Sequence, residues 1–160
     1  MRFFLDTEFS ERGPMFPISL ISIGIVAEDG REFYAHSSEY DPKSCNDWVI
    51  ANVLPSVAGY PRQTLGEIRS AALRFVGKET PEFWGYYADY DWVVFCQSIF
   101  GMMVELPKGW PMYCNDLKQV AMQIGNPGLP PQLSPEHNAL NDARWNKEVY
   151  AFLKAAGASL

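Results

Sequence analysis

Asp6 and Glu8 stand one residue apart in the opening stretch MRFFLDTEFS, with apolar and aromatic residues on both sides. On a β-strand, side chains two residues apart lie on one face, about 7 Å from each other. A buried carboxylate costs several kcal/mol unless a cation or a proton compensates its charge. This separation suits two carboxylates that share a pair of divalent ions about 3.5–4 Å apart, an arrangement that hydrolyses phosphodiesters. The triplet alone is more often the solvated face of an edge strand.

A second pair of acids lies in the stretch WGYYADYDW, residues 84–92, just before an apolar segment. An acid near a helix N-terminus can cap the helix and complement its dipole, and Asp89 fits this structural role as the N-cap. Asp91 would lie one turn into the helix, between Tyr90 and Trp92, and fits a capping role less well. Both acids therefore stay open as candidates for a chemical role.

The third group, HNALND, covers residues 137–142, where a loop rich in proline and glycine meets a predicted helix. Two positions five residues apart on a continuous helix point about 140° away from each other. His137 and Asp142 can therefore converge only if His137 lies on the approach to the helix and Asp142 within its first turns. An exposed loop histidine is the simpler interpretation of His137 considered alone.

Together, the acids and the histidine supply the groups that two-metal phosphodiester hydrolysis requires. Asp6, Glu8, Asp91 and Asp142 offer oxygen ligands, which suit hard Mg²⁺ or Mn²⁺ ions rather than zinc. His137 can act as the base that deprotonates the attacking water, because the ordinary pKa of imidazole lies near neutrality. A metal-dependent phosphodiester hydrolase is one hypothesis, and an acidic α/β protein with capping aspartates is the other.

Length and charge limit the choice of function further. The chain has 160 residues, and we expect a single domain over 1–160. A formal net charge of −6 argues against a broad basic surface that grips duplex nucleic acid. No apolar run reaches the roughly 18 residues that span a bilayer, and the N-terminal stretch lacks a signal-peptide pattern, so we expect a cytoplasmic protein. Three distant cysteines predict buried free thiols: Cys45, Cys96 and Cys114.

The elements that must position these residues follow from the apolar patterns. Alternation predicts strands over residues 1–6, 18–30, 31–38, 82–88 and 110–116, and the first three form an antiparallel meander. Helical spacing predicts helices over residues 44–54, 64–78, 89–101, 116–125 and 138–157. The first helix is expected to stop before Pro55, and the second to begin with a capping box between Thr64 and Glu67. This order predicts an α/β fold with a mixed five- to six-stranded sheet flanked by helices.

The segments FLDTEF, YADYDW and HNALND resemble, in order and spread, the three exonuclease motifs of the DEDDh superfamily. The third segment has the H-x-A-x-x-D form of that superfamily. The DTEF opening, the LISIG strand and the YDWVVFCQ helix also resemble a small family of RNase T-like 3′–5′ exoribonucleases from mycobacteria and phages. The resemblance covers nearly the whole chain, and it implies a ribonuclease H-like fold.

The residues that this resemblance carries over onto the three motifs are Asp6, Glu8, Asp91, His137 and Asp142. Asp91 is preferred to Asp89 because the second motif places its acid directly after an aromatic residue. We hypothesise that Asp6, Glu8 and Asp142 hold one Mg²⁺ or Mn²⁺ ion, and that Asp6 and Asp91 hold a second, the latter through water. In this scheme His137 is the general base.

The resemblance implies an enzyme that releases nucleoside 5′-monophosphates from the 3′ end of single-stranded or short RNA. A homodimer is expected, because dimers are common among RNase T-like enzymes. The alternatives are a 3′–5′ exodeoxyribonuclease of the same fold, a non-catalytic module that binds nucleotides or RNA ends, and a ribonuclease H-like endonuclease. The sequence alone leaves the choice between RNA and DNA open.

Three residues are expected to contact the substrate. Phe9, directly after Glu8, is the first candidate for stacking on the terminal base, Tyr87 is the second, and Thr7 lies between the two acids. Many members of the superfamily carry His-Asn where this chain has Tyr86-Tyr87, so the contacts to the base or sugar are expected to differ. Ordinary core packing is the alternative for each aromatic. Aromatics on apolar helical stripes are assigned to the core or to an interface: Trp48, Phe100 and Trp145.

Overall fold

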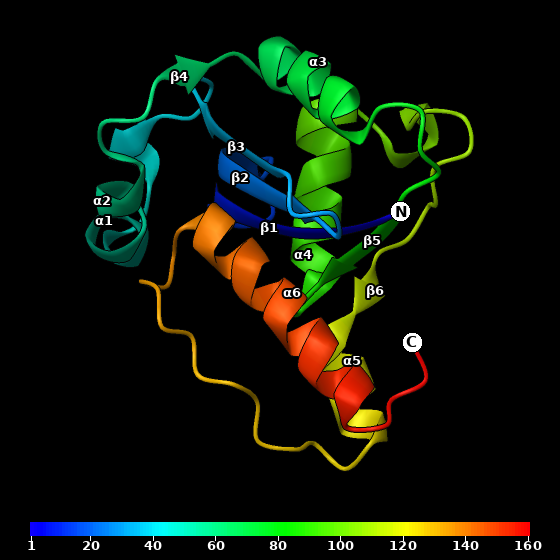
Figure 1. Ribbon diagram of the computed structural model, residues 1–160. Coiled ribbons are helices and arrows are strands. Elements are labelled where there is room, and N and C mark those ends of the chain that lie inside the picture. The colour runs from blue at the N-terminus through cyan, green and yellow to red at the C-terminus, as the bar shows by residue number, and fades with distance from the viewer.

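The computed structural model describes residues 1–160 and contains one mixed six-stranded sheet (Figure 1). Its strands are β1 (Arg2–Ser10), β2 (Ser19–Ala27), β3 (Glu32–Ser37), β4 (Arg62–Gln63), β5 (Glu82–Gly85) and β6 (Asn115–Asp116). The first three strands form the predicted antiparallel meander, and the remaining pairings are parallel. The order β4-β3-β2-β1-β5-β6 confirms the mixed sheet of the prediction.

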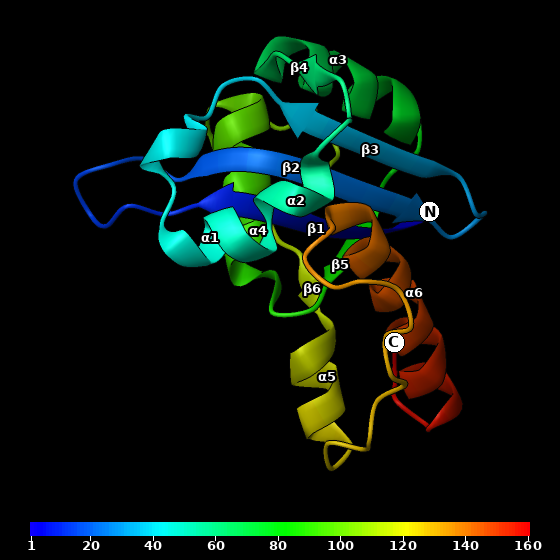
Figure 2. The ribbon, with the colours of Figure 1, turned by 90° about the vertical axis from the view of Figure 1, so that its left-hand side faces the viewer.

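Helices cover both faces of this sheet (Figures 1 and 2). One face carries α3 (Leu65–Val76) and α4 (Ala88–Val94), which continues as a π-helix over Phe95–Phe100. The other face carries α5 (Leu117–Gln123) and α6 (Ala139–Ala155). The short helices α1 (Asp47–Asn52) and α2 (Leu54–Val57) lie at the end of the sheet where α6 begins. None of these helices is both long and apolar enough to cross a membrane.

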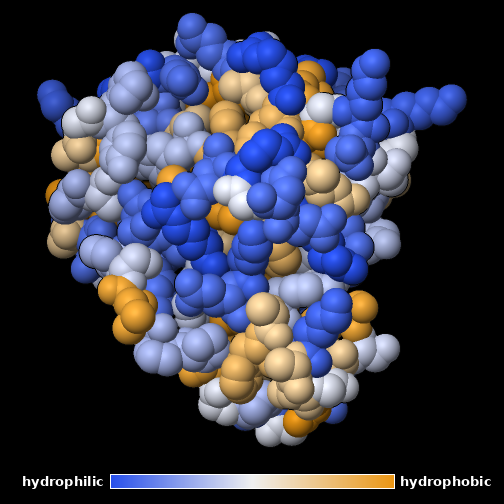
Figure 3. Space-filling model, viewed as in Figure 1, coloured by the Kyte–Doolittle hydropathy of each residue, from blue (hydrophilic) through white to orange (hydrophobic).

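Strand alternation separates two apolar cores and decides which face carries the acids. Phe3 and Leu5 point toward α3 and α4, whereas Phe4 points to the opposite face and packs against α5 and α6. Asp6 and Glu8 continue the series of Phe4, so they lie on the face that α6 covers. The outer surface on this side is mostly hydrophilic, and its broadest apolar area lies around the end of α6 (Figure 3).

A β-bulge on β2 gives the chain a third, smaller core. The register between β1 and β2 shifts after Glu8, which leaves Ile21 as one additional residue on β2. Ile21 is fully buried among Val49 of α1, Val57 of α2 and Val53, the residue between the two helices. The α1–α2 segment is therefore anchored on the end of the sheet where the carboxylates of β1 lie.

Several predicted bounds differ from the structure. The helix predicted over 44–54 is two short helices, and α2 runs through Pro55, because proline in the first turn of a helix needs no partner for an N–H. The strand predicted over 110–116 is paired only at Asn115–Asp116, since Trp110 packs against aromatic rings of the larger core. The two-residue strand β4 is too short to show alternation and was not predicted.

Candidate active site

The first turn of α6 lies directly on β2 at Gly24. A Cβ atom at this position would lie 2.2 Å from the carbonyl oxygen of Ala139, so only glycine allows the helix to approach this closely. Gly24 is also the residue of β2 that pairs with Asp6 of β1. The approach therefore brings Asp142, in the first turn of α6, over the strand that carries Asp6.

Two asparagines fix α6 in this position. The buried Asn146 side chain donates to the carbonyl oxygen of Leu5 on β1 at 2.9 Å. Asn138 is the N-cap of α6, and its side-chain oxygen accepts from the backbone N–H of Asn141 at 3.2 Å. The side-chain amide of Asn138 donates to the carbonyl oxygen of Ser56 in α2 at 3.3 Å. The start of α6 is thus tied to β1 and to the α1–α2 segment.

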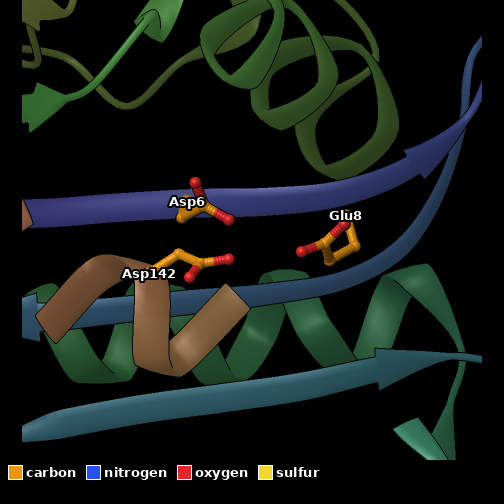
Figure 4. A group of neighbouring side chains, drawn as sticks. All are labelled: Asp6, Glu8 and Asp142. Carbon is orange, nitrogen blue, oxygen red and sulfur yellow. The ribbon is translucent and has the colours of Figure 1, made fainter. Parts of the chain in front are cut away.

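Three carboxylates meet where α6 crosses β1. Asp6, Glu8 and Asp142 each bring one oxygen atom into a group whose members all lie within 4.8 Å of one another (Figure 4). Glu8 is buried, and the other two acids are half-buried. We call these three residues the carboxylate triad. It joins acids that stand near opposite ends of the chain.

Burial and mutual repulsion make the carboxylate triad a poor site for three negative charges. Burial raises the pKa of Glu8 to about 8, and the charges of Asp142 and Asp91 add to this shift. The pKa of Asp6 is raised well above its usual range, first by burial and then by the surrounding acids. Burial also raises the pKa of Asp142. Such a group requires protons or cations to neutralise it, and its oxygen atoms are the donors that hard divalent ions prefer.

Asp91 reaches the same region from α4. Its Oδ1 accepts two hydrogen bonds from Thr7, one from the backbone N–H at 2.9 Å and one from the hydroxyl at 2.6 Å. Burial raises the pKa of Asp91 to about 6, although the two bonds from Thr7 oppose the rise. Asp91 is therefore buried directly against the residue that separates Asp6 from Glu8, and its Oδ1 is occupied.

Asp89 lies elsewhere, and its predicted N-cap role is wrong. The N-cap position of α4 is Tyr87, and Asp89 is exposed in the first turn. The backbone N–H of Ala88 is satisfied instead by Asp116, whose Oδ2 accepts it at 2.8 Å across the parallel pair β5–β6. No local pattern predicts this cap, because Asp116 is distant along the chain.

His137 lies on the approach to α6, as convergence with Asp142 requires. Its backbone has a φ of +62°, in the left-handed region that side chains rarely adopt. His137 lines a pocket of about 570 Å³ together with Asp6 and Asp142. Its ring packs edge-on against Trp48 of α1, with 4.8 Å between the ring centroids. Trp48 is not a core residue, since 54% of it is exposed.

The remaining walls of this pocket are aromatic on one side and formed by a loop on the other. Tyr86, Tyr87 and Trp145 form the aromatic wall, and Pro130, Pro131 and Gln132 form part of the loop wall. The Trp145 indole N–H donates to the Pro130 carbonyl oxygen at 2.9 Å, which joins the two walls. The Gln132 side-chain amide donates to Asp142 Oδ1 at 2.5 Å. Gln132 was not among the predicted site residues, because a glutamine in a proline-rich loop carries no signal of its own.

The predicted substrate contacts occupy three different settings. Tyr87 is 63% exposed at the pocket, with a left-handed φ of +56°. Phe9 is half-buried and stacks in parallel on Tyr90 of α4, with 5.6 Å between the ring centroids. Thr7 is buried, and its hydroxyl donates to Asp91. Phe100 is a core residue, as predicted, and Trp145 is half-buried beside the pocket.

Comparison with protein families matches residues 1–153 to the 3′–5′ exoribonuclease Rv2179c-like domain. Two relatives from Mycobacterium tuberculosis are each 42% identical to this chain over 150 residues. They are the 3′–5′ exoribonuclease Rv2179c of strain H37Rv and the 3′–5′ exoribonuclease MT2234.1 of strain CDC 1551. Each alignment covers 90% of this chain and 88% of the relative.

Among solved structures, Escherichia coli exonuclease I in complex with a 5cy-dT13 oligonucleotide is similar, with a TM-score of 0.54 and 12% sequence identity. The match covers 97% of this chain but only 41% of that one. At this level of identity the likeness concerns the fold, and it agrees with the ribonuclease H-like architecture expected from the sequence.

Proposed function

This chain belongs to the family of 3′–5′ exoribonuclease Rv2179c-like domains and is a nuclease, and we propose the reaction that it catalyses. It removes nucleoside 5′-monophosphates from the 3′ end of single-stranded or short RNA by two-metal-ion hydrolysis. The observation that supports this mechanism best is the carboxylate triad, with all three oxygen atoms within 4.8 Å of one another. Capping aspartates would have no reason to meet in this way.

The carboxylate triad fits a divalent ion in its chemistry and its charge. Carboxylate oxygens suit Mg²⁺ or Mn²⁺. Burial, and for Asp6 and Glu8 also the charges of neighbouring acids, raises the pKa values of the triad, so a cation there would be stabilising. Asp6, Glu8 and Asp142 would hold one ion, while Asp6 and Asp91 would hold the second. When bound, the ions would lower the pKa of the attacking water and stabilise the charge on the leaving 3′ oxygen.

His137 is the proposed general base. It shares the pocket with Asp6 and Asp142, so it faces the place where the scissile phosphate would be held. A neutral imidazole nitrogen can accept the proton of the attacking water there. Replacing His137 with alanine should lower turnover by a factor of about 10² or more while leaving the ligands for the ions in place.

Stacking on aromatic rings is the proposed way of holding the terminal bases. Tyr87 offers an exposed ring at the pocket. Phe9 is the second candidate; it stacks on Tyr90, packs against the larger core and does not line this pocket. Each such contact is worth about 1–3 kcal/mol per base. This mode suits an acidic protein, and it suits single-stranded or short substrates better than duplexes.

Two arginines that could contact phosphates are already engaged within the chain. Arg144 forms a two-pronged ion pair with Glu32, with distances of 2.8 and 2.7 Å, and Arg62 donates to two backbone carbonyl oxygens. We therefore propose a homodimer in which the partner subunit brings basic side chains to the substrate. Light scattering after gel filtration tests the dimer directly.

The activity is tested with matched, 5′-labelled RNA and DNA oligonucleotides, each incubated with Mg²⁺, Mn²⁺ or EDTA. A ladder that shortens by single nucleotides on RNA, and only with a divalent ion, is the expected result. Stepwise loss from DNA alone would replace RNA as the substrate, and internal cuts would indicate an endonuclease. Binding of the oligonucleotide without any cleavage would indicate a module that only binds RNA ends.

A further inference from the structure

The ring of Trp48, on α1, contacts the ring of the proposed general base. The ring centroids of Trp48 and His137 are 4.8 Å apart and their planes are nearly perpendicular, at 79°. This is an edge-to-face contact, the arrangement that aromatic pairs prefer. Trp48 lies on α1 and His137 directly precedes the N-cap of α6, so the contact joins two segments far apart in the sequence.

His137 lies outside the regular secondary structure. It precedes α6 and follows a loop rich in proline, and its φ of +62° is a backbone state that requires support from surrounding contacts. It lines the same pocket as Asp6 and Asp142, which places the residue beside the carboxylate triad. A ring at such a position acts as a base only if something keeps it facing the triad.

Trp48 lies on a well-anchored helix. The next residue, Val49, is buried in the small core that Ile21 of β2 completes, and the Asn46 side chain caps the helix by accepting from the backbone N–H of Val49 at 2.9 Å. The same segment also holds the residue after the histidine, because the Ser56 carbonyl oxygen accepts from Asn138. A side chain on this anchored segment can hold the ring that it contacts in one orientation.

We infer that Trp48 is a positioning residue that holds the His137 imidazole toward the carboxylate triad. The inference rests on the proposed role of His137 as the general base. An exposed tryptophan beside an active site could serve instead as a stacking platform for an RNA base. The two roles predict different results, which allows them to be separated.

The first measurement needs neither metal nor substrate. The chain has only two histidines, so labelling the ¹³Cε1 of histidine gives two signals, and His137→Ala identifies which is which. Trp48→Ala should increase the mobility of the His137 ring in ¹³C relaxation, while Trp48→Phe should largely preserve its order. His36, buried and 3.0 Å from the Tyr40 hydroxyl, is the internal control and should not change. An unchanged relaxation of the His137 ring would overturn the inference.

The second measurement is a double-mutant cycle of kcat and KM on a single-stranded RNA. Trp48→Ala should lower kcat by about 10-fold, as misplacing a reacting group does, with little change in KM. The same substitution in the His137→Ala protein should have no further effect on kcat, and Trp48→Phe should restore most of the activity. Ile50→Ala, an exposed apolar position on the same helix, is the matched control and should leave both constants unchanged.

Each other outcome has one meaning. A raised KM and an equal loss in both backgrounds would show that Trp48 binds RNA directly, and the positioning role would be wrong. Full activity of His137→Ala would refute the proposed base, and an inactive wild-type protein would refute the proposed function. In both of those cases the relaxation measurement still decides whether Trp48 orders the ring.

Discussion

The acids and the histidine of this site are held by two different kinds of structure. The carboxylate triad stands on β1 and α6, which are fixed to each other by the close approach at Gly24 and by the bond from Asn146. His137 stands on a loop, in a left-handed backbone state, and its ring rests on the side chain of Trp48. The part of the site that would hold ions is therefore built from the main scaffold. The part that would move a proton depends on a contact between distant segments.

This difference predicts how the two parts respond to change. Damage to the carboxylate triad should remove the ligands of the proposed ions, whatever happens to the loop. Damage to the loop should change ion binding far less and act mainly on the chemical step. Mutations can test the comparison in order of their expected effect.

Asp142→Asn should have the largest effect, a loss of activity by a factor on the order of 10³ or more. The substitution removes a charged ligand, and with it several kcal/mol of stabilisation at the transition state. The measurement is kcat/KM on single-stranded RNA, together with Mn²⁺ binding by calorimetry. The fold should survive, because removing one of three crowded negative charges relieves repulsion.

Asp89→Asn is the matched control for this experiment. Asp89 is an exposed acid of α4, it precedes Asp91 by two residues, and it lies outside the carboxylate triad. We expect wild-type activity from Asp89→Asn and a strong loss from Asp91→Asn. The reverse pattern would show that Asp89, and not Asp91, is the acid of the second motif.

Gly24→Ala should have the next largest effect. The new methyl group would meet the backbone of Ala139, which no side-chain rotation can move aside, so the start of α6 must shift. Overpacking of this kind costs about 1–3 kcal/mol in the free energy of unfolding. Because Asp142 moves with the helix, activity should fall together with stability. Urea unfolding and the RNA assay measure the two effects.

Gly66→Ala provides the comparison for Gly24→Ala. A Cβ atom at Gly66, on α3, would meet no atom within 4 Å. The substitution should be neutral or stabilise the protein by up to about 1 kcal/mol, the difference in helix propensity. Equal effects of the two substitutions would show that the approach of α6 to β2 does not position Asp142.

The sequence predicted the strands and acids of the rigid part because local patterns determine them. Alternation in FFLDTEF places Asp6 and Glu8 on one face, and the capping box at Thr64 and Glu67 is present as predicted. The resemblance of the three motifs then related these acids to Asp142, at the other end of the chain. No local pattern predicts the close approach at Gly24, since a glycine in a strand can equally mark a bulge, a bend or a close approach of another segment.

The surroundings of the histidine could not be predicted in the same way. Trp48 lies on an apolar helical stripe, which normally marks a core position, yet its ring lies at the surface against His137. Gln132 contacts Asp142 from a loop without periodicity. Contacts of this kind depend on how a loop packs against helices and strands that are distant in the sequence. Secondary-structure propensities and the spacing of apolar residues carry no information about them.

Thermal stability measured against pH tests the electrostatics of the carboxylate triad. The pKa of Glu8 is raised to about 8, from an ordinary value near 4.5 in the unfolded chain, and the pKa of Asp6 is raised as well. The unfolded state therefore releases protons first, and without metal the stability should be greatest near pH 4.5 and fall as pH rises toward 8. Mg²⁺ should reduce this fall, because a bound cation replaces the protons.

The control for this experiment is Glu8→Gln in EDTA. Its melting temperature should fall less between pH 5 and pH 8 than that of the wild type, since the group with the pKa near 8 is gone. A wild-type melting temperature that rises over this range without metal would contradict the crowding of charge on which the proposed ion site depends.

Gln132→Ala should have the smallest effect, and it shows how far the loop contributes to the rigid part. The Gln132 amide donates to Asp142 Oδ1 at 2.5 Å, so it orients a carboxylate that α6 already fixes. Loss of such an outer partner weakens metal binding by about 10-fold at most where the ligand itself stays anchored, the lower end of the range for these contacts. Calorimetry with Mn²⁺ measures this change, and Leu133→Ala, at the 94% exposed neighbouring position, is the control. A loss of Mn²⁺ affinity as large as that of Asp142→Asn would mean that the proline-rich loop, and not α6, holds the carboxylate of Asp142 in place. The division between a carboxylate triad held by the scaffold and a histidine held by a loop would then be wrong.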